Sequence, residues 1–440
     1  MTTATLTNHA QWRDAPIHAD QAWSLAPDDA TRHALARLQA ELGDLFTVTD
    51  PRSGATHWVI NDPALVQQVL VRQADAYTKG LGLDRVKILL GNGIMVSEGD
   101  FWIRQRRLMQ PAFRPQRLAD HNAMILTENE RLSERWQRAA DAARAVDAAA
   151  DVSELILVIV LRAIFGPDYD TLVEAGANPF SLLTEEPTRD LRFAARFHGL
   201  KKTVGTIIDA RLARDEPRFD FLGQLMTANG RDGQTMDRAA LIDEVMTLIV
   251  AGHETTASAL AFAWYLIATH PDIRARLQAE ADGCDRAKLA ATGGHDDPGL
   301  ALTDRVIAET LRLYPPGWLL SRRARYDHSL GGYPIAAGTQ LVICPWLLHR
   351  HPAYWHAPDV FDPDRFLAAR KPSRHAAFVP FAAGPRHCIG EHLAWAEMRL
   401  HLVSQLARFT PEWAGNGPPD LEAGINLRPA GTMPLQLRAR

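Results

Sequence analysis

The sequence predicts one large, mainly α-helical domain with small β-sheets. Apolar residues recur at helical spacing over long stretches, above all in 119–230 and 241–267. The strand-like runs are short and separated from one another along the chain. No internal repeat or second module is apparent in the 440 residues. We therefore expect residues 41–440 to form the domain, with 1–40 as a polar N-terminal segment of the same domain.

The composition is that of a soluble globular protein, with 46% hydrophobic and 23% charged residues. A formal net charge of −4 gives no reason to expect nucleic acid or an anionic membrane as a partner. The three cysteines, Cys284, Cys344 and Cys388, are far apart and form no C-x-x-C pair. Structural zinc and a disulfide framework are therefore not expected, and a reducing cytoplasm is the natural compartment.

No segment has the pattern of a membrane anchor. The N-terminal stretch, 1–40, is mostly polar and contains no signal-peptide core. The most apolar run, 155–161, is too short to cross a bilayer and is followed by Arg162. This run predicts a buried core helix.

The first predicted elements are a β-hairpin and a capped helix. Strand-like runs in 45–60 flank the turn residues of 50–54. Asp62 then offers an N-cap, and Pro63 suits the first position of a helix. The next segment, 77–97, is rich in glycine and is expected to be a loop.

An aromatic and a basic residue then share a predicted helix face, because Trp102 and Arg106 are four residues apart. This spacing fits a binding function, and it also fits an amphipathic helix with solvated arginines. Further positive charge lies nearby on Arg104, Arg107, Arg114 and Arg117. The region that follows, 119–230, is helical in pattern with breaks at Gly and Pro.

The most continuously apolar pattern, 241–267, predicts a long buried helix that ends before Pro271. The motif A-G-H-E-T-T lies inside it, at 251–256. Gly252 weakens a helix locally, and threonine hydroxyls can bond to carbonyls of the preceding turn and widen it. A widened turn would leave room for a small ligand beside the helix.

Two interpretations of this motif are open from the residues alone. In the first, Thr255 and Thr256 only satisfy backbone groups and Glu254 is a structural acid. In the second, the acid Glu254 and the alcohol Thr255 act together in proton transfer. His253 precedes Glu254 at the variable position of the motif and is interpreted as a packing or pocket-edge residue, not as a metal ligand.

The next helix is predicted after a Gly- and Asp-rich loop, 283–298. It carries Glu309 and Arg312, which are three residues apart and can pair, and it is stopped by the prolines of 315–316. Arg365 follows later, in an F-D-P-D-R-F stretch.

Short strands are predicted near Arg322 and in 332–344. Arg322 and Arg323 are neighbours, so alternation along a strand would place them on opposite faces. The C-terminal stretch, 425–437, reads as a β-hairpin.

One cysteine stands in a particular loop, F-x-x-G-x-R-x-C-x-G, which contains Phe381, Gly384, Arg386 and Cys388. The residues after it, from Glu391, have helical composition, so the thiol would lie just before a helix start. Backbone N–H donors and a helix N-terminus favour a thiolate, and haem iron accepts a thiolate as its ligand. The other interpretation is a small buried hydrophobic cysteine.

These motifs, in this order and spacing, resemble the cytochrome P450 family, and the resemblance runs from about residue 40 to the C-terminus. It implies the family's fold and haem b with Cys388 as the iron ligand. The stretch around Arg365 resembles the family's P-E-R-F motif, with Asp364 in place of glutamate, and implies that Arg365 completes a structural group with Glu309 and Arg312. Arg322 matches the position of a propionate-binding arginine, and Arg323 is the less favoured choice. The cofactor-binding residues that it implies are Cys388, Arg386, Arg322, Trp102, Arg106, Phe381, Gly384 and Ala251. Ala251 is expected to contribute as part of the pocket wall.

The resemblance also implies a monooxygenase that activates O2 with NAD(P)H-derived electrons and hydroxylates a C–H bond. Thr255 and Glu254 are then the catalytic pair that relays protons. Ferredoxin and ferredoxin reductase, or a flavodoxin-type donor, would be separate proteins that dock near the arginines around Trp102. The protein is expected to be a cytoplasmic monomer.

The predicted substrate is a lipophilic small molecule, such as a fatty acid, a terpenoid or another natural product. The residues that suggest an apolar pocket are Thr247, Val250, Ala251, Leu319 and Leu320. Three rival functions are a peroxide-using enzyme, a haem-thiolate isomerase or dehydratase, and a non-enzymatic haem or gas sensor. The acid–alcohol pair argues against all three.

Overall fold

The computed structural model describes residues 16–20, 22–174, 178–185, 191–214, 218–230, 233, 235–367 and 377–440. The fold is mainly helical, as the sequence predicts. The α-helices are α1 (Asp29–Leu42), α2 (Pro63–Gln67), α3 (Leu83–Leu90), α4 (Gly99–Met109), α5 (Pro115–Asp141), α6 (Ala148–Phe165), α7 (Pro167–Glu174), α8 (Leu182–Glu185), α9 (Leu191–Arg214), α10 (Phe221–Thr227), α11 (Arg238–Thr269), α12 (Pro271–Asp282), α13 (Arg286–Thr292), α14 (Ala301–Leu313), α15 (Pro345–Leu348) and α16 (Glu391–Leu406).

Short helical turns of other types join these helices. One is a π-helical turn, η1 (Gln68–Arg72). The others are 3₁₀ turns, η2 (Ala74–Ala76), η3 (Gln110–Phe113), η4 (Pro179–Ser181), η5 (Pro298–Leu300), η6 (Pro363–Phe366) and η7 (Gly384–Arg386).

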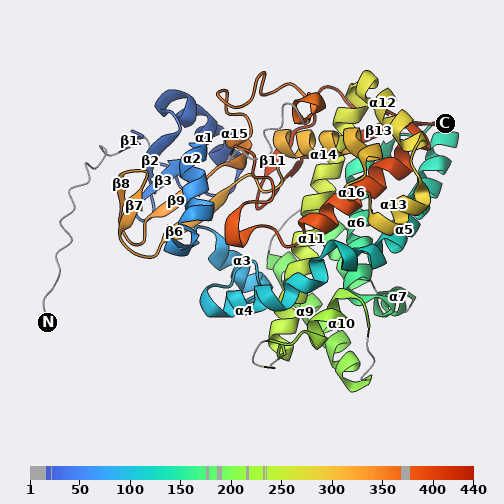
Figure 1. Cartoon of the computed structure of the whole chain (residues 1–440), viewed down its shortest axis with the longest axis horizontal. Coiled ribbons are helices and arrows are strands. Elements are labelled where there is room, and N and C mark those ends of the chain that lie inside the picture. The colour runs from blue at the N-terminus through green and yellow to red at the C-terminus, as the bar shows by residue number, and fades with distance from the viewer. Residues whose placement is uncertain are drawn as a thin grey trace, which may run out of the picture.

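The largest sheet and the β7–β8 pair lie at the end of the molecule opposite most of the helices, whereas β11 lies near the middle and β13 at the helical end (Figure 1). The largest described sheet has the order β1-β2-β3-β9-β6-β4. The predicted hairpin is confirmed, because β2 and β3 pair antiparallel with Leu45 opposite Ile60. The strands are β1 (Ile17–His18), β2 (Leu45–Thr49), β3 (Thr56–Ile60), β4 (Tyr77–Lys79), β5 (Val146–Asp147), β6 (Leu320–Ala324), β7 (His328–Leu330), β8 (Tyr333–Ile335), β9 (Gln340–Ile343), β10 (Phe409–Trp413), β11 (Leu421–Ala423), β12 (Leu427–Pro429) and β13 (Pro434–Ala439).

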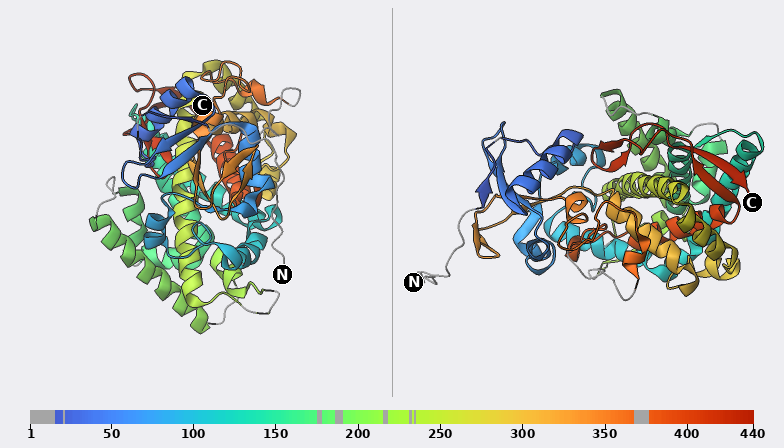
Figure 2. Two further views of the ribbon diagram at one scale, coloured as in Figure 1. Left: turned by 90° about the vertical axis from the view of Figure 1, so that its left-hand side faces the viewer. Right: turned by 90° about the horizontal axis from the view of Figure 1, so that it is seen from above.

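The long helix α11 runs through the middle of the helical part in both views of Figure 2. Its first turn is capped by Asp237, whose carboxylate accepts from the N–H of Ala240 at 2.8 Å. It ends before Pro271, as predicted, and packs against α6, α9, α14 and α16. Within the described residues α11 is the one helix long and apolar enough to span a membrane, and 67% of its most apolar window is buried in the fold. The core helix of a globular protein meets the same criterion.

Two segments predicted as loops contain helices. Segment 77–97 holds β4 and α3, and segment 283–298 holds α13. The glycines that suggested loops instead bound the helices: Gly82 and Gly91 flank α3 with positive φ, and Gly293 ends α13 in the left-handed region. The prediction erred because it weighed these glycines above the short helical patterns between them.

The predicted C-terminal hairpin is also wrong in its pairing. Both strands exist, but β12 pairs with β11 and β13 pairs with β10. In the second pair Phe409 lies opposite Ala439 and Trp413 opposite Leu435, so five residue pairs form. A longer ladder with buried side chains outweighs pairing between sequence neighbours, and β12 is left to form a hairpin with the strand before it.

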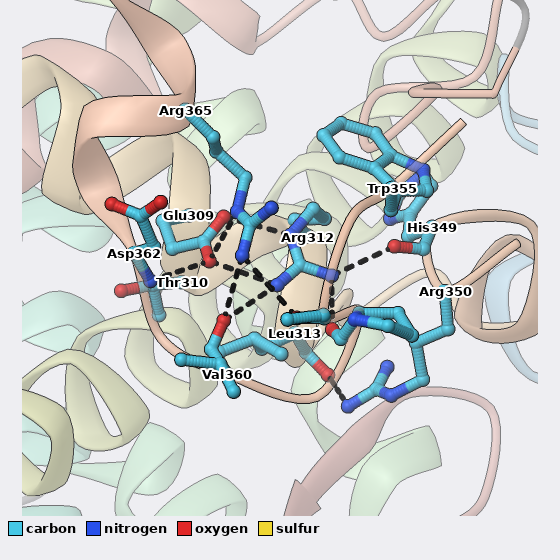
Figure 3. A network of polar contacts seen from close by, with 12 residues as sticks. Glu309, Thr310, Arg312, Leu313, His349, Arg350, Trp355, Val360, Asp362 and Arg365 are labelled. Atoms are coloured by element: carbon cyan, nitrogen blue, oxygen red, sulfur yellow. Dashed lines mark hydrogen bonds and ion pairs between the residues drawn. The ribbon is translucent and has the colours of Figure 1, made fainter. Parts of the chain in front are cut away.

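A buried ion-pair group connects α14 to the loop before η6 (Figure 3). Glu309 accepts from Arg312 at 2.7 and 2.8 Å and from Arg365 at 2.9 Å. Glu309 and Arg312 are fully buried and Arg365 is 9% exposed. Both arginines also donate to loop carbonyls, among them that of Val360. The sequence predicted this group from the E-x-x-R spacing and Arg365.

Candidate active site

The loop before α16 places Cys388 at the start of that helix. Its N–H donates to the carbonyl of Phe381 at 3.0 Å, which closes the loop. Gly384 has φ +70, and a Cβ there would lie 1.9 Å from the carbonyl oxygen of Leu70. Only glycine therefore fits this position, for reasons of both backbone angle and space.

Cys388 lines a cavity. Cys388 has a large accessible surface although it lies within the fold, because that surface belongs to the cavity wall. Burial raises the pKa of the Cys388 thiol, while the N–H groups of Gly390 and Glu391 and the charge of Arg106 act in the opposite direction. These donors favour the thiolate, which is the form that binds a metal.

The cavity has a volume of about 300 Å³ and lies between α11 and the Cys388 loop. Thr255 and Ala251 belong to the α11 wall, and Phe381 and Cys388 belong to the opposite wall. The remaining walls are largely apolar and come from α6, α14 and α16, with Phe113 and Phe221 at one end. The two conspicuous motifs of the sequence thus line one space.

Positive charge gathers beside the cavity. Arg386 lines the cavity, stacks on the ring of Trp102 with 3.7 Å to the centroid, and pairs with Glu98. Lys79 on β4 pairs directly across the strands with Arg322 on β6. Side chains at directly opposed strand positions share a face, so two cations lie close together there.

The pKa values of these cations record the crowding. Burial, Arg386 and Arg322 lower the pKa of Lys79 to about 7. Burial and Arg386 lower the pKa of Arg322 to about 10. Glu98 acts in the opposite direction on both groups, and Glu244 does so on Lys79, but the pKa of each cation still stays below its ordinary value. The site therefore favours an anionic group at this place.

The residues of α4 meet the cysteine loop from the other side. Arg106 donates to the carbonyl of His387 at 2.8 Å, so it fixes the residue before Cys388. Trp102 carries the Arg386 guanidinium on its ring face. Of the two neighbouring arginines on β6, Arg322 is buried and Arg323 is exposed, which follows the strand alternation used in the sequence analysis.

The threonine of α11 that lines the cavity makes the bond expected from its position. The hydroxyl of Thr255 donates to the carbonyl of Ala251 at 2.8 Å, yet the helix is continuous through the motif. The expected widening therefore does not interrupt the helix. Gly252 brings α11 close to α6, since a Cβ there would lie 3.2 Å from Val160. His253 contacts Ser153 of α6, in agreement with a packing role.

The residues named for the substrate pocket divide into two groups. Leu320 and Ala251 line the cavity. Thr247, Val250 and Leu319 are not among its lining residues. Thr247 lies beneath Gly93, where a Cβ would be 2.2 Å from its hydroxyl oxygen.

Sequence reasoning missed four polar residues near the site: Lys79, Glu98, Glu397 and Asn426. Glu397 of α16 is 2% exposed, lines the cavity and bonds to Thr256. Burial raises the pKa of Glu397 to about 8. Asn426 donates to Glu254 at 3.0 Å. No spacing signal marks these residues, because each meets the site through the fold.

Haem b fits this site by its chemistry. The cavity wall is largely apolar, a cysteine belongs to it, and buried cations beside it suit the carboxylates of the haem propionates. A mainly helical fold with this site, opposite an A-G-x-E-T-T helix, defines the class of haem-thiolate oxygenases.

Comparison with known proteins agrees with this class. The family described as Cytochrome P450 matches residues 22–195 and 178–434. Cyclooctatin synthase of Streptomyces melanosporofaciens is 36% identical over 79% of this chain and 79% of its own length. Pentalenene oxygenase of Streptomyces avermitilis is 31% identical over 86% of each chain. The crystal structure of the cytochrome P450DA heme domain superposes with a TM-score of 0.83 at 25% identity, covering 97% of this chain and 98% of that one. The chain belongs to the cytochrome P450 family and is a monooxygenase.

Proposed function

We propose that this monooxygenase binds haem b through Cys388 and hydroxylates a C–H bond of a terpenoid. The observation that carries the proposal is the place of Cys388 in the wall of an apolar cavity, across from Thr255. The terpenoid class is favoured over fatty acids because relatives are named for cyclooctatin and pentalenene, which are terpenoids. The largely apolar wall of the cavity suits a hydrocarbon skeleton.

The haem propionates would be held by the cations beside the cavity. Arg386, Arg322 and Lys79 are buried or half-buried, and burial together with repulsion from neighbouring cations lowers the pKa of each despite the carboxylates of Glu98 and Glu244. Arg106 and Trp102 would act partly through the loop, since Arg106 holds the carbonyl before Cys388 and Trp102 supports Arg386.

Thiolate-ligated haem supplies O2 binding and the electron donation that favours O–O cleavage. The overall reaction takes RH, O2, two electrons and two protons to ROH and H2O, so the protein must deliver two protons. The hydroxyl of Thr255 donates to Ala251, so its oxygen is left as an acceptor on the cavity side and can hold a proton-carrying water. Glu254, which directly precedes Thr255 in the chain, is the group that exchanges protons with solvent.

The electrons would come from a ferredoxin and a ferredoxin reductase, or from a flavodoxin-type donor. Arg107, Arg114 and Arg117 are exposed around α4 and η3, near the Cys388 loop, and Arg104 is half-buried. An acidic partner would be attracted to this surface, and the rate of its association would fall as salt increases.

The first test is the carbon monoxide difference spectrum of the reduced protein, beside a Cys388→Ala variant. A strongly red-shifted Soret band that the variant lacks supports the thiolate ligand. A band typical of histidine-ligated haem, or no haem, refutes the proposal. Turnover without any electron donor would instead favour an isomerase or dehydratase, and haem without turnover would favour a sensor.

The substrate class is tested by titrating the ferric protein with pentalenene, other cyclic terpenoids and dodecanoic acid, and following the haem absorption shift. We expect cyclic terpenoids to give the shift at lower concentration than the fatty acid. The reverse order would refute the terpenoid assignment and leave the monooxygenase assignment intact.

A further inference from the structure

The carboxylate of Glu98 connects three parts of the site. Glu98 directly precedes α4, and its Oε2 pairs with the guanidinium of Arg386 on the Cys388 loop. Its Oε1 accepts from the backbone N–H of Lys79 on β4 at 2.8 Å. Glu98 is not among the residues that line the cavity, whereas Arg386 is. One side chain outside the cavity wall therefore ties together the start of α4, the Cys388 loop and β4.

The side chain of Arg386 is fixed by three contacts. Besides the pair with Glu98, its Nη1 donates to the carbonyl of Ser97 at 2.9 Å, and its guanidinium lies 3.7 Å from the centroid of the Trp102 ring. Only 16% of the side chain of Arg386 is exposed. An arginine that is already held in one conformation binds a carboxylate at a smaller cost in entropy than a freely rotating one. Glu98 thus helps to prepare Arg386 for an acidic group.

The charge of Glu98 acts on all three cations beside the cavity. Burial lowers the pKa values of Lys79, Arg322 and Arg386, and in each case the carboxylate of Glu98 acts in the opposite direction. Glu244 does the same for Lys79. The three cations lie on β4, β6 and the Cys388 loop, so Glu98 offsets part of a positive charge to which several elements contribute.

A negative charge at this place affects the reduction of a haem bound beside it. Reduction of ferric to ferrous haem adds one electron, so neighbouring cations favour the ferrous form and neighbouring anions favour the ferric form. The side chain of Glu98 is 34% exposed. Water screens a half-buried charge less than an exposed one, so the effect of Glu98 on the cations is retained at ordinary salt concentration. Removal of this charge should therefore favour the ferrous form.

We propose that Glu98 is a positioning residue for haem, which holds Arg386 on the Trp102 ring and supplies a negative charge that lowers the haem reduction potential. This inference rests on the proposed function, in which Cys388 binds haem and the cations receive its carboxylates. It adds a residue that controls how firmly the site holds haem and how easily the haem is reduced. Glu98 thereby helps to set how readily an electron donor reduces the loaded protein.

Three substitutions separate the position of Glu98 from its charge. Glu98→Gln keeps the length of the side chain and an oxygen acceptor, but removes the charge. Glu98→Asp keeps the charge on a shorter side chain, and Glu98→Ala removes both the charge and the acceptor. Asp100→Asn is the matched control, because Asp100 lies two residues further along, is exposed, and loses the same charge.

The first assay measures the equilibrium between ferric and ferrous haem in the loaded protein, without substrate and against a redox dye of known potential. At an equal dye ratio we expect Glu98→Gln to raise the ferrous-to-ferric ratio about fivefold, because one half-buried negative charge is lost beside the haem carboxylates. Glu98→Asp and Asp100→Asn should stay within about twofold of the parent, since the first keeps the charge and water screens the second. A role in folding alone would not raise this ratio.

The second assay measures the transfer of haem to excess apomyoglobin. Glu98→Ala removes one of the three contacts that hold Arg386, so we expect haem to leave several-fold faster than from the parent. In an Arg386→Leu background, Glu98→Ala should have little further effect, because the two residues act as one unit. Carbon monoxide difference spectra and melting curves establish that each variant is loaded and folded. If Glu98→Ala does not fold, the ratio measured for Glu98→Gln still decides.

The outcomes distinguish this inference from the proposed function. If Glu98→Gln changes the ferrous-to-ferric ratio no more than Asp100→Asn does, the inference is wrong. It is also wrong if Glu98→Ala speeds haem transfer equally in the parent and in the Arg386→Leu background. In both cases the proposed function stands, because the parent still shows the thiolate band with carbon monoxide. If the parent lacks that band, the proposed function fails and this inference fails with it.

Discussion

The buried ion-pair group around Glu309 is predicted to stabilise the fold without taking part in the chemistry. The test is Arg365→Leu. This change removes the donor to Glu309 Oε1 at 2.9 Å and the donors to the carbonyls of His356 at 2.8 Å, Val360 at 3.0 Å and Ala357 at 3.4 Å. Glu309 keeps both bonds to Arg312, so its charge is still compensated (Figure 3).

The expected cost follows mainly from the bond to Glu309. The carbonyl of Val360 keeps Arg312 as a donor, and the carbonyl of Ala357 keeps the N–H of Val360. His356 is exposed, so water can replace the arginine at its carbonyl. We therefore expect Arg365→Leu to lower the free energy of unfolding by about 1.5–3 kcal/mol, which is the contribution of a hydrogen bond between charged groups. This is less than the cost of leaving a buried charge unpaired, because Arg312 still compensates Glu309.

The matched control is the neighbouring residue. Asp364 pairs with Arg276 at 3.2 Å and Arg305 at 3.3 Å near the surface. Exposed pairs of this kind contribute at most about 1 kcal/mol, so Asp364→Asn should lower the free energy of unfolding by less than that. Urea unfolding followed by far-ultraviolet circular dichroism measures both variants.

The spectrum of the folded fraction provides the second readout. A structural role leaves the carbon monoxide band of folded Arg365→Leu at the parent position. The reasoning is refuted if Asp364→Asn costs as much as Arg365→Leu, or if the arginine variant is stable but its band moves.

Three further predictions follow. Thr255→Ala should raise the share of electrons released as H2O2 several-fold while the absorption shift on substrate binding is retained, and parent-level coupling would contradict the relay. Gly384→Ala should abolish haem retention, because a Cβ would lie 1.9 Å from the Leu70 oxygen. Gly199→Ala is the control and should retain haem, since no atom lies within 4 Å of a Cβ at that position. Equal haem content in the two variants would contradict the steric argument. Burial raises the pKa of Glu397 to about 8, so its contribution to the free energy of unfolding is full below pH 4.5 and is lost as the pH rises through 8. In urea unfolding, Glu397→Gln should therefore become more stable relative to the parent between pH 5 and pH 9. A stability difference that does not change with pH would contradict the burial of a protonated acid.

Local signals predicted the parts of the fold that local physics decides. Alternation and turn residues gave the β2–β3 hairpin, and Asp62 with Pro63 gave the start of α2, where Asp62 accepts from Leu65 N–H at 2.9 Å. The E-x-x-R spacing gave one pair of the buried group. In each case the residues that decide the structure lie within a few positions of one another.

The failures arise where partners are distant. The sequence shows β13 as a strand, but nothing local shows that its partner is β10 and not β12. The same holds within the site. Asn426 meets Glu254 across 172 positions, and Lys79 meets Arg322 only because β4 lies beside β6. A pattern within one segment has no information on such contacts.

The pairing of Lys79 with Arg322 fits the proposed binding of a cofactor with acidic groups. Like charges at opposed strand positions are destabilising, and burial lowers the pKa of both residues. The two cations lie near Glu98 and Arg386, and Arg386 and Cys388 line one cavity. In the proposed complex, a haem held by Cys388 would bring its propionate carboxylates to these cations, and this would offset a charge placement that is unfavourable in the protein alone.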